Sequence, residues 1–313
     1  MDLLFVIDAP ESLKAYKDTS VAMMRAAQKR GHGVWVCGQE SLHWKQGRVS
    51  AAAQRISLTD NDEDWYRAHE HAERSLAQFG ASVMRKDPPF DLEYVVSTWL
   101  LSAAVRDGAR VFNAPDAIRD HNEKLAIAEF GSFTAPTLVS REPERIQAFI
   151  DEHRDVVVKR LDVMGGEHVF RVRTDDPNRN VIVETISQRG ARTVMAQRYI
   201  PEITEGDKRV ILIGGKLVPH CLARIPKAGE SRGNLAAGAR GVAQPVTKRH
   251  REIAEALGSV LSKRGLLLVG LDVIGDYLTE VNVTSPTGFR EIQDQTGFDV
   301  SAMFLDSLEQ KIS

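Results

Sequence analysis

Residues 266–286, LLLVGLDVIGDYLTEVNVTSP, show the alternation of two β-strands joined by a tight turn. With a three-residue loop at 275–277, Ile274 lies opposite Leu278. Successive side chains of a strand point to opposite faces, so this register gathers the apolar side chains on one face. They are Leu267, Val269, Leu271, Val273, Val281 and Val283. The stretch therefore predicts a hairpin with one core-facing side.

The other face of this hairpin is polar and carries Gly270, Asp272, Glu280 and Asn282, with Asp272 directly opposite Glu280. A two-residue loop would shift the pairing by one residue and separate the two carboxylates. Two carboxylates and an amide oxygen are suitable ligands for Mg²⁺, which also binds phosphates. The alternative is a solvated face of an edge hairpin. Gly270 favours the first interpretation, because a strand glycine often marks close approach of a ligand.

A lysine and a glycine pair follow one another further upstream. Lys159 lies near the end of an expected strand, 156–160, and Gly165 and Gly166 follow within a few residues. A lysine there can contact a phosphate while the glycine loop offers backbone N–H groups. The alternative is a lysine whose ammonium extends into solvent. Neither the dinucleotide fingerprint nor the P-loop pattern occurs in the chain.

The N-terminal part has the pattern of an open parallel sheet. An expected strand at 3–7, a helix at 21–29 and a strand at 34–36 form a βαβ unit. Further expected elements are a strand at 82–85, a helix at 93–106 and a strand at 110–112. We place the first domain boundary at residue 122, followed by two lobes at 123–198 and 199–313.

The expected elements of these lobes are strands at 156–160, 169–172 and 194–200, a hairpin over 209–223, and helices at 181–188, 248–264 and 300–311. The glycine- and alanine-rich stretch 226–241 predicts a long loop, and loops of this length are often functional.

Composition narrows the class of protein. The 313 residues are 42% apolar, enough for a sizeable core, and 41 basic against 43 acidic residues give a net charge of −2. This near-neutral net charge gives no overall positive charge that would attract nucleic acid or an anionic membrane. Cys37 and Cys221 have no metal-ligand spacing and predict reduced thiols. With no secretory signal pattern and no membrane-length apolar run, we expect a cytoplasmic protein.

Taken together, these stretches resemble the bacterial glutathione synthetases of the ATP-grasp superfamily. The resemblance runs from about residue 1 to 310. It is carried by MRKDPPF at 84–90, NEK at 122–124, VK at 158–159, DVMGG at 162–166, AQRYIP at 196–201, GDKR at 206–209, RIP at 224–226, RGNLAAG at 232–238, GLD at 270–272 and TEVNVTSP at 279–286.

The resemblance implies an α/β fold, with an N-terminal open-sheet (pre-ATP-grasp) domain followed by a two-lobed α+β ATP-grasp region. It also implies a ligase that joins γ-glutamylcysteine to glycine through an acyl phosphate, giving glutathione, ADP and phosphate. ATP is then a co-substrate, with Mg²⁺ or alternatively Mn²⁺ as the metal. Family members are commonly homotetramers. No nucleic-acid or membrane partner is expected.

Site residues follow from the same resemblance. Phosphate contacts are expected from Lys124, Lys159, Gly165 and Gly166, and a further nucleotide contact from Lys208. Adenine is expected at Gln197, Arg198, Tyr199 and Ile200, and the metal at Asp272, Glu280 and Asn282. Arg209, Arg224 and Arg232 would neutralise substrate carboxylates and phosphoryl charge, and the loop 225–241 would form a lid.

Two positions depart from the family pattern, which has glycine at Val163 and proline at Arg160. A β-branched residue is strained at positive φ, so we predict a negative φ for Val163. Two rival functions remain open: another ATP-grasp ligase, differing around 85–90 and 224–238, or an ATP-binding protein without catalysis.

Two motif-like segments are interpreted as incidental. Residues 229–233 match G-x-S-x-G, but the sequence predicts no strand before them and no helix after them, as a nucleophile elbow requires. His69-Glu70-His71 does not have the spacing of a metal motif, and we expect a solvated helix there.

Overall fold

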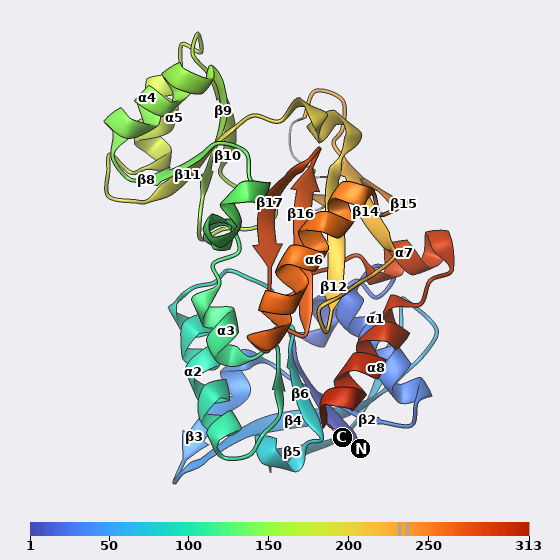
Figure 1. Ribbon diagram of the computed structural model, residues 1–313. Coiled ribbons are helices and arrows are strands. Elements are labelled where there is room, and N and C mark those ends of the chain that lie inside the picture. Colours follow the sequence, from blue (N-terminus) through green and yellow to red (C-terminus); the bar gives the residue numbers. More distant parts are fainter. Residues whose placement is uncertain (231–232, 236–237, 313) are drawn as a thin grey trace.

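The N-terminal sheet is built around the apolar strand β1 (Asp2–Val6) in the computed structural model, which describes residues 1–230, 233–235 and 238–312. β1 pairs in parallel with β2 (Gly33–Cys37) and β6 (Ala81–Met84), and β7 (Val111–Phe112) extends the sheet in parallel. The helix α1 (Thr19–Lys29) connects β1 and β2 (Figure 1). The predicted βαβ opening is confirmed.

An antiparallel extension of this sheet was not expected. β3 (Leu42–Lys45), β4 (Arg48–Leu58) and β5 (Tyr66–Ser75) add to it beside β2. The helix predicted around His69-Glu70-His71 is wrong, because this segment belongs to β5 and pairs with β4. A long ladder with a neighbouring strand supplies backbone hydrogen bonds that the local polar pattern does not reveal.

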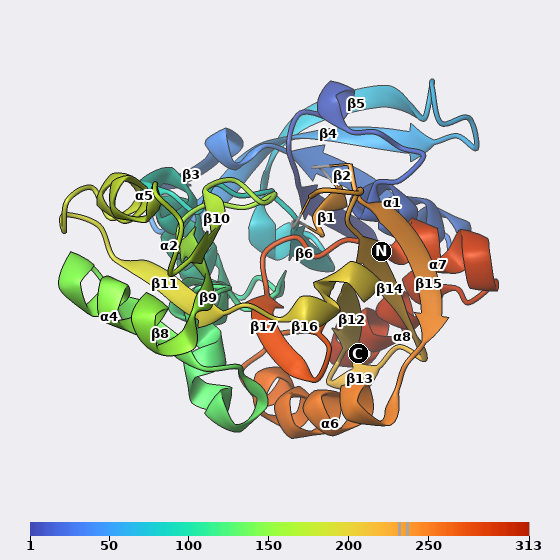
Figure 2. The same cartoon turned by 90° about the horizontal axis from the view of Figure 1, so that it is seen from above.

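The small lobe is a separate four-stranded antiparallel sheet in the order β10-β9-β11-β8. Its strands are β8 (Thr137–Ser140), β9 (Asp155–Arg160), β10 (Val169–Arg173) and β11 (Val194–Arg198). The helices α4 (Pro143–His153) and α5 (Arg179–Ile186) cover one face and bury Ile146, Ile150 and Val183 against it. Seen from above, this lobe lies to one side of the molecule (Figure 2).

The large lobe has a sheet of order β15-β14-β12-β16-β17, with β13 (Lys216–Leu217) beside β12. Its strands are β12 (Asp207–Ile213), β14 (His220–Ile225), β15 (Arg240–Pro245), β16 (Leu268–Ile274) and β17 (Tyr277–Asn282). The helix α6 (Lys248–Lys263) packs on the face of Val210 and Leu212. The opposite face packs against α7 (Phe289–Thr296) and α8 (Val300–Ile312).

The N-terminal domain and the large lobe are joined at the base of the predicted hairpin. After β7, the buried Asn113 donates from Nδ2 to the carbonyls of Leu268 and Val283, each at 2.8 Å, and accepts from the Leu268 N–H at 2.9 Å. The helices α2 (Leu92–Arg106) and α3 (Pro115–Asp120) lie together on one side of this joint (Figure 1). The two strands that carry the polar face are therefore both held at the base of the hairpin.

The predicted hairpin is confirmed in its pairing but not in its turn. The loop has two residues, because Ile274 pairs with Tyr277 and Val273 with Leu278. The register then shifts between Val273 and Asp272, so that Asp272 lies opposite Glu280. An extra residue on one strand, here Thr279, restores the register that a two-residue turn would have broken. The stability gained by burying the apolar face therefore exceeds the cost of interrupting the regular hydrogen-bond ladder.

Within the described part of the chain, no helix is long and apolar enough to cross a membrane.

Candidate active site

A row of charged side chains crosses the sheet of the large lobe. Arg209 on β12 pairs with Asp272 on β16, and Asp272 pairs with Glu280 on β17. The Arg209 guanidinium donates from Nε to Asp272 Oδ1 at 2.5 Å and from Nη2 to Oδ2 at 3.1 Å. Arg224 on β14 reaches the same carboxylate, with 2.8 Å between Nη2 and Oδ2. Two guanidinium groups therefore bind one carboxylate, and all three side chains are buried.

A second carboxylate, Asp207, completes this group. It lies opposite Arg224, with 2.5 Å between Arg224 Nη2 and Asp207 Oδ2. Burial raises the pKa of Asp207 to about 7, and the nearby Asp272 charge acts in the same direction. Burial would also raise the pKa of Asp272, but Arg209 and Arg224 hold it below its usual range. Asp272 is therefore the more acidic member of the pair.

Two lysines converge on Glu280 from outside this sheet. Lys159 of β9 lies 3.4 Å from Glu280 Oε1, and Lys124 lies 3.9 Å from the same oxygen. Burial and the Lys124 charge lower the pKa of Lys159. Burial alone would raise the pKa of Glu280, but the two lysines lower it. The lobes thus meet at an ion cluster of three carboxyl groups and four basic side chains.

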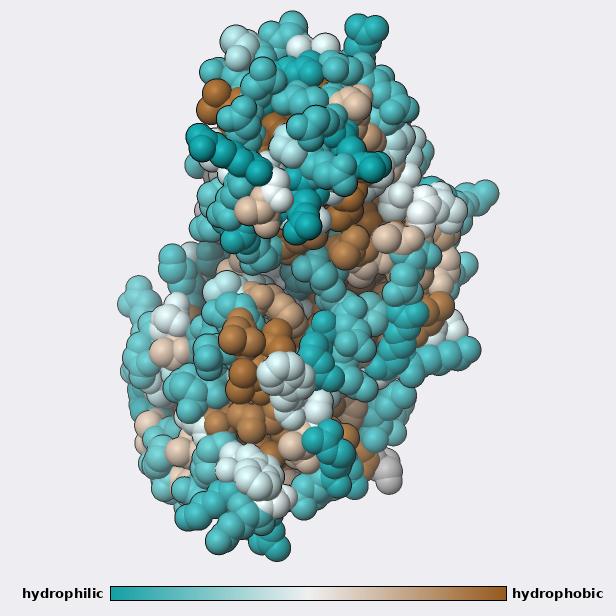
Figure 3. All heavy atoms as spheres, turned by 90° about the vertical axis from the view of Figure 1, so that its left-hand side faces the viewer, coloured by the Kyte–Doolittle hydropathy of each residue, from teal (hydrophilic) through white to brown (hydrophobic). Residues whose placement is uncertain are grey.

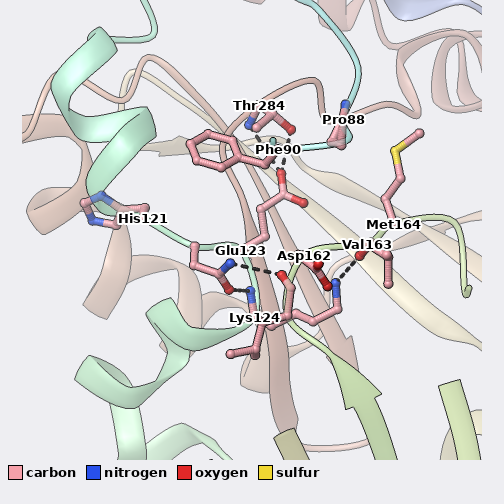
Figure 4. Close-up of a pocket in the computed structure, with 11 residues that line it drawn as sticks. Pro88, Phe90, His121, Glu123, Lys124, Asp162, Val163, Met164 and Thr284 are labelled. Atoms are coloured by element: carbon pink, nitrogen blue, oxygen red, sulfur yellow. Dashed lines mark hydrogen bonds between the residues drawn. The ribbon is translucent and has the colours of Figure 1, made fainter. Parts of the chain in front are cut away.

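This cluster lines a cavity of about 230 Å³ between the lobes. Of the predicted site residues, the cavity brings together Lys124, Gly165, Gly166, Arg209, Arg224, Asp272, Glu280 and Asn282. In the close-up of the adjoining crevice, the Lys124 ammonium donates to the Val163 carbonyl at 2.6 Å (Figure 4). Val163 is not among the residues with positive φ, which confirms the prediction for its backbone.

A second cavity of about 100 Å³ adjoins the first and shares Glu280 with it. Lys159 and the predicted adenine segment line it. Its apolar walls include Val157, Ile203 and Ile274, which suit the faces of a planar ring. The Tyr199 ring packs against Arg171, 3.5 Å from the guanidinium carbon, and Arg198 donates to the Tyr277 hydroxyl at 3.1 Å.

One predicted site residue lies away from the two cavities, and another lies outside the described residues. The Lys208 ammonium donates to the carbonyls of Glu205 and Gly206, and its side chain lines neither cavity. Arg232 lies outside the described residues, as does Ser231 of the G-x-S-x-G match. In the described part of that region, β14 ends at Ile225 and residues 226–230 form no strand, so no strand leads directly into the match.

Three charged residues were missed as site residues by the sequence reasoning. Arg85 directly follows β6 and is buried. Its guanidinium donates to the Ser20 hydroxyl and to the Pro286 carbonyl, at 3.1 Å each, and its Nη1 has no hydrogen-bond partner. Glu123 lines the cavity and accepts from the Thr284 hydroxyl at 2.6 Å (Figure 4). Asp207 was detectable, because it lies two residues before Arg209 and therefore shares its strand face.

The donor set fits a hard divalent cation. Asp272, Glu280 and Asn282 lie on one face of the hairpin and line the same cavity. The Asn282 amide donates from Nδ2 to the Gly270 carbonyl at 3.3 Å, which leaves the amide oxygen as the acceptor. The described residues contain no group of three or more His, Cys, Asp or Glu side chains suited to a metal. An oxygen set of this kind suits Mg²⁺ rather than a softer ion.

Comparison with known protein families agrees with this geometry. Residues 1–119 match the model of the prokaryotic glutathione synthetase N-terminal domain, and residues 123–297 match that of the prokaryotic glutathione synthetase ATP-grasp domain. Together the two models span most of the chain.

Curated relatives match along the full length. A glutathione synthetase of Ralstonia nicotianae is 56% identical over 99% of this chain and 96% of the relative. One from Bordetella parapertussis is 57% identical over 99% of each chain. Among solved structures, the D-cycloserine synthetase DcsG aligns over 100% of both chains with a TM-score of 0.70. At 16% identity, that likeness shows the fold alone. By its two domain models and its full-length relatives, this chain belongs to the family of prokaryotic glutathione synthetases.

Proposed function

We propose that this chain condenses γ-glutamylcysteine with glycine at the cavity between its lobes and releases glutathione, ADP and phosphate. Membership in the glutathione synthetase family makes it an ATP-dependent ligase. The observation that carries the residue assignment is the row of Arg209, Asp272 and Glu280 across neighbouring strands, which faces two lysines from outside this sheet.

The ion cluster suggests how a triphosphate would be received. Lys124 and Lys159 are both paired with the single carboxylate of Glu280, so two ammonium groups share one negatively charged partner. Phosphate oxygens that enter the cavity would take hydrogen bonds from both ammonium groups, each of which has three donors. Glu280 would then be released as an oxygen ligand. The base would lie in the second cavity, against Gln197 and Ile200.

A divalent cation is the second component of this proposal. Asp272, Glu280 and Asn282 would hold it, and when bound it would neutralise charge on the phosphates and orient them. Arg209 and Arg224 border the same cavity as Asp272. We assign them to substrate carboxylates and to charge that develops during transfer, because preorganised cations stabilise such charge in a water-poor site.

Exclusion of water, subunit number and location remain predictions. We assign water exclusion to the loop 225–241, because an acyl phosphate hydrolyses in water. A homotetramer is expected from the family resemblance. Figure 3 shows apolar side chains gathered on the body below the small lobe, where α2 exposes Leu92, Trp99 and Val105. Exposed apolar faces of this kind often mark subunit contacts. A cytoplasmic location is expected from the reduced cysteines.

The test is an omission series. The purified chain is incubated with Mg²⁺, ATP, γ-glutamylcysteine and glycine, each component is left out in turn, and ADP and glutathione are both measured. The proposal expects equal amounts of ADP and glutathione, and no glutathione without either amino-acid substrate. ADP release that does not depend on glycine would point to another acceptor amine. No ADP release with any acceptor would identify an ATP-binding protein without catalysis.

A further inference from the structure

The glycine loop begins at a carboxylate that two arginines hold. Asp162 follows β9 and lies three residues before Gly165. Arg160, the last residue of β9, donates from Nε to Asp162 Oδ1 at 2.9 Å and from Nη2 to Oδ2 at 2.6 Å. Arg192, from the turn before β11, donates to the same Oδ2. We call these three residues the Asp162 clamp.

The residues on either side of Asp162 are bound to the opposite wall of the cavity. The Asn122 amide donates to the Leu161 carbonyl at 3.0 Å. The Lys124 ammonium donates to the Val163 carbonyl at 2.6 Å, as the close-up shows (Figure 4). Asp162 is therefore tied to the small lobe by its side chain, while its neighbours are tied by their backbone to the segment that contains Lys124. A shift of the loop start would move the Lys124 ammonium with it.

The Asp162 clamp fixes the position of the loop start and adds little to the stability of the fold. Its side chains are 20% exposed at Arg160, 39% at Asp162 and 34% at Arg192, and ion pairs this open to water add little to folding. Its geometry is nonetheless restrictive, because the planar fork of Arg160 binds both carboxylate oxygens and fixes the carboxylate plane. In phosphoryl transfer, a misplacement of about 1 Å is enough to cost on the order of a hundredfold in rate.

We propose that Arg160 and Arg192 are positioning residues for the nucleotide: by holding Asp162 they place Gly165, Gly166 and the Lys124 ammonium around its phosphates. The proposal rests on the proposed function, since it takes this cavity as the phosphate site. The lysine relays the effect, because an ammonium has three donors and can keep the Val163 carbonyl while it binds a phosphate oxygen.

The test compares Arg160→Gln, Arg192→Gln and the double variant with the unchanged protein. Binding of Mg·ADP is measured by calorimetry, and KM for each substrate and kcat are measured in the ligase assay. We expect about a threefold loss of Mg·ADP affinity in each single variant and about tenfold or more in the double variant. KM for ATP should rise in parallel, while KM for γ-glutamylcysteine and for glycine stays unchanged.

Two further variants separate position from general damage. Arg160→Lys keeps the charge without the fork, so it should recover only part of the affinity lost in Arg160→Gln. Arg179→Gln removes a matched pair in the same lobe, between Arg179 and Asp151, where the Nη1–Oδ1 distance is 2.6 Å and neither residue lines the phosphate cavity. It should bind Mg·ADP like the unchanged protein.

The outcomes discriminate between the two proposals. If the double variant binds Mg·ADP as tightly as the unchanged protein, or if Arg179→Gln weakens binding equally, the clamp has no positioning role. Weakened Mg·ADP binding in a protein that makes no glutathione would support the clamp and reject the proposed ligation. Normal glutathione synthesis with unchanged Mg·ADP affinity in the double variant would support the proposed ligation and reject the positioning role of the clamp.

Discussion

Asp272 and Asp162 each bind two arginines, yet their surroundings differ sharply. The Asp272 side chain is 3% exposed, on a central strand, and its arginines come from two neighbouring strands of the same sheet. The Asp162 side chain is 39% exposed at the start of a loop, and its arginines lie at the edge of the small lobe. Loss of a charged partner costs more stability when the remaining charge is buried than when it is open to water. Similar ion pairs therefore have different roles at the two aspartates. The buried cluster is part of the fold, whereas the exposed one orients a loop.

The largest effect is expected from Asp272→Asn. The variant leaves Arg209 and Arg224 buried beside a neutral amide, so we expect a loss of about 3–5 kcal/mol in the free energy of unfolding. Ligase activity should fall by about 10³-fold, because a metal ligand and the orientation of both arginines are lost. Chemical denaturation and ADP release measure the two effects. Asp276→Asn, at the exposed turn of the same hairpin, is the control and should change neither.

Lys159→Met probes the buried cluster from the other lobe. Methionine fills a similar volume, and Glu280 keeps Lys124 as a cation within 3.9 Å, so the fold should persist. We expect kcat/KM for ATP to fall by about 10²-fold, because a positioned charge on the phosphates is lost. Steady-state kinetics with varied ATP provide the measurement, and Lys216→Met on the exposed strand β13 is the matched control. Unchanged kinetics would remove Lys159 from the phosphate site.

Asp162→Asn tests the exposed cluster by the same substitution as the first prediction. Because the carboxylate is open to water, we expect the free energy of unfolding to change by no more than about 1 kcal/mol. The comparison of the two aspartates would fail if denaturation showed equal losses for Asp162→Asn and Asp272→Asn. Both variants are measured in one buffer, since ion pairs depend on salt.

The smallest effect concerns a buried histidine whose ring accepts a backbone hydrogen bond. His250 accepts from the Thr247 N–H at Nδ1, at 3.2 Å, in the capping box of α6. Burial and the Lys208 charge lower the pKa of His250 from 6.5. A lowered histidine pKa gives stability that is present above pH 6.5 and is lost as the pH falls, because the unfolded chain binds the proton more readily.

His250→Gln should therefore flatten the decline of the melting temperature between about pH 7 and pH 5. Glutamine also serves the third position of a capping box, so at pH 8 the variant should lie within about 1 kcal/mol of the unchanged protein. Thermal unfolding across this range is the measurement. Parallel pH profiles for the two proteins would show that protonation of His250 is not coupled to folding.

Sequence reasoning predicted the hairpin pairing correctly and its turn incorrectly, for one reason. The alternation of apolar and polar residues indicates which side chains share a face, and it correctly placed Asp272 opposite Glu280. It does not record where an extra residue is inserted, and a bulge at Thr279 made a two-residue turn compatible with that face. The strand at His69–His71 was missed likewise, because its partner β4 rather than its own polar pattern holds it in the sheet.

What the sequence alone determined is local: the apolar and polar faces of the hairpin, the lysine near the end of an apolar strand, and the βαβ opening. What only the tertiary structure decided is which distant strands are neighbours. Arg209 lies 63 residues from Asp272, yet β12 and β16 are adjacent, and this adjacency makes the buried ion cluster. Periodicity arises from the geometry of one strand, whereas the pairing of strands depends on the burial and hydrogen bonding of the whole sheet.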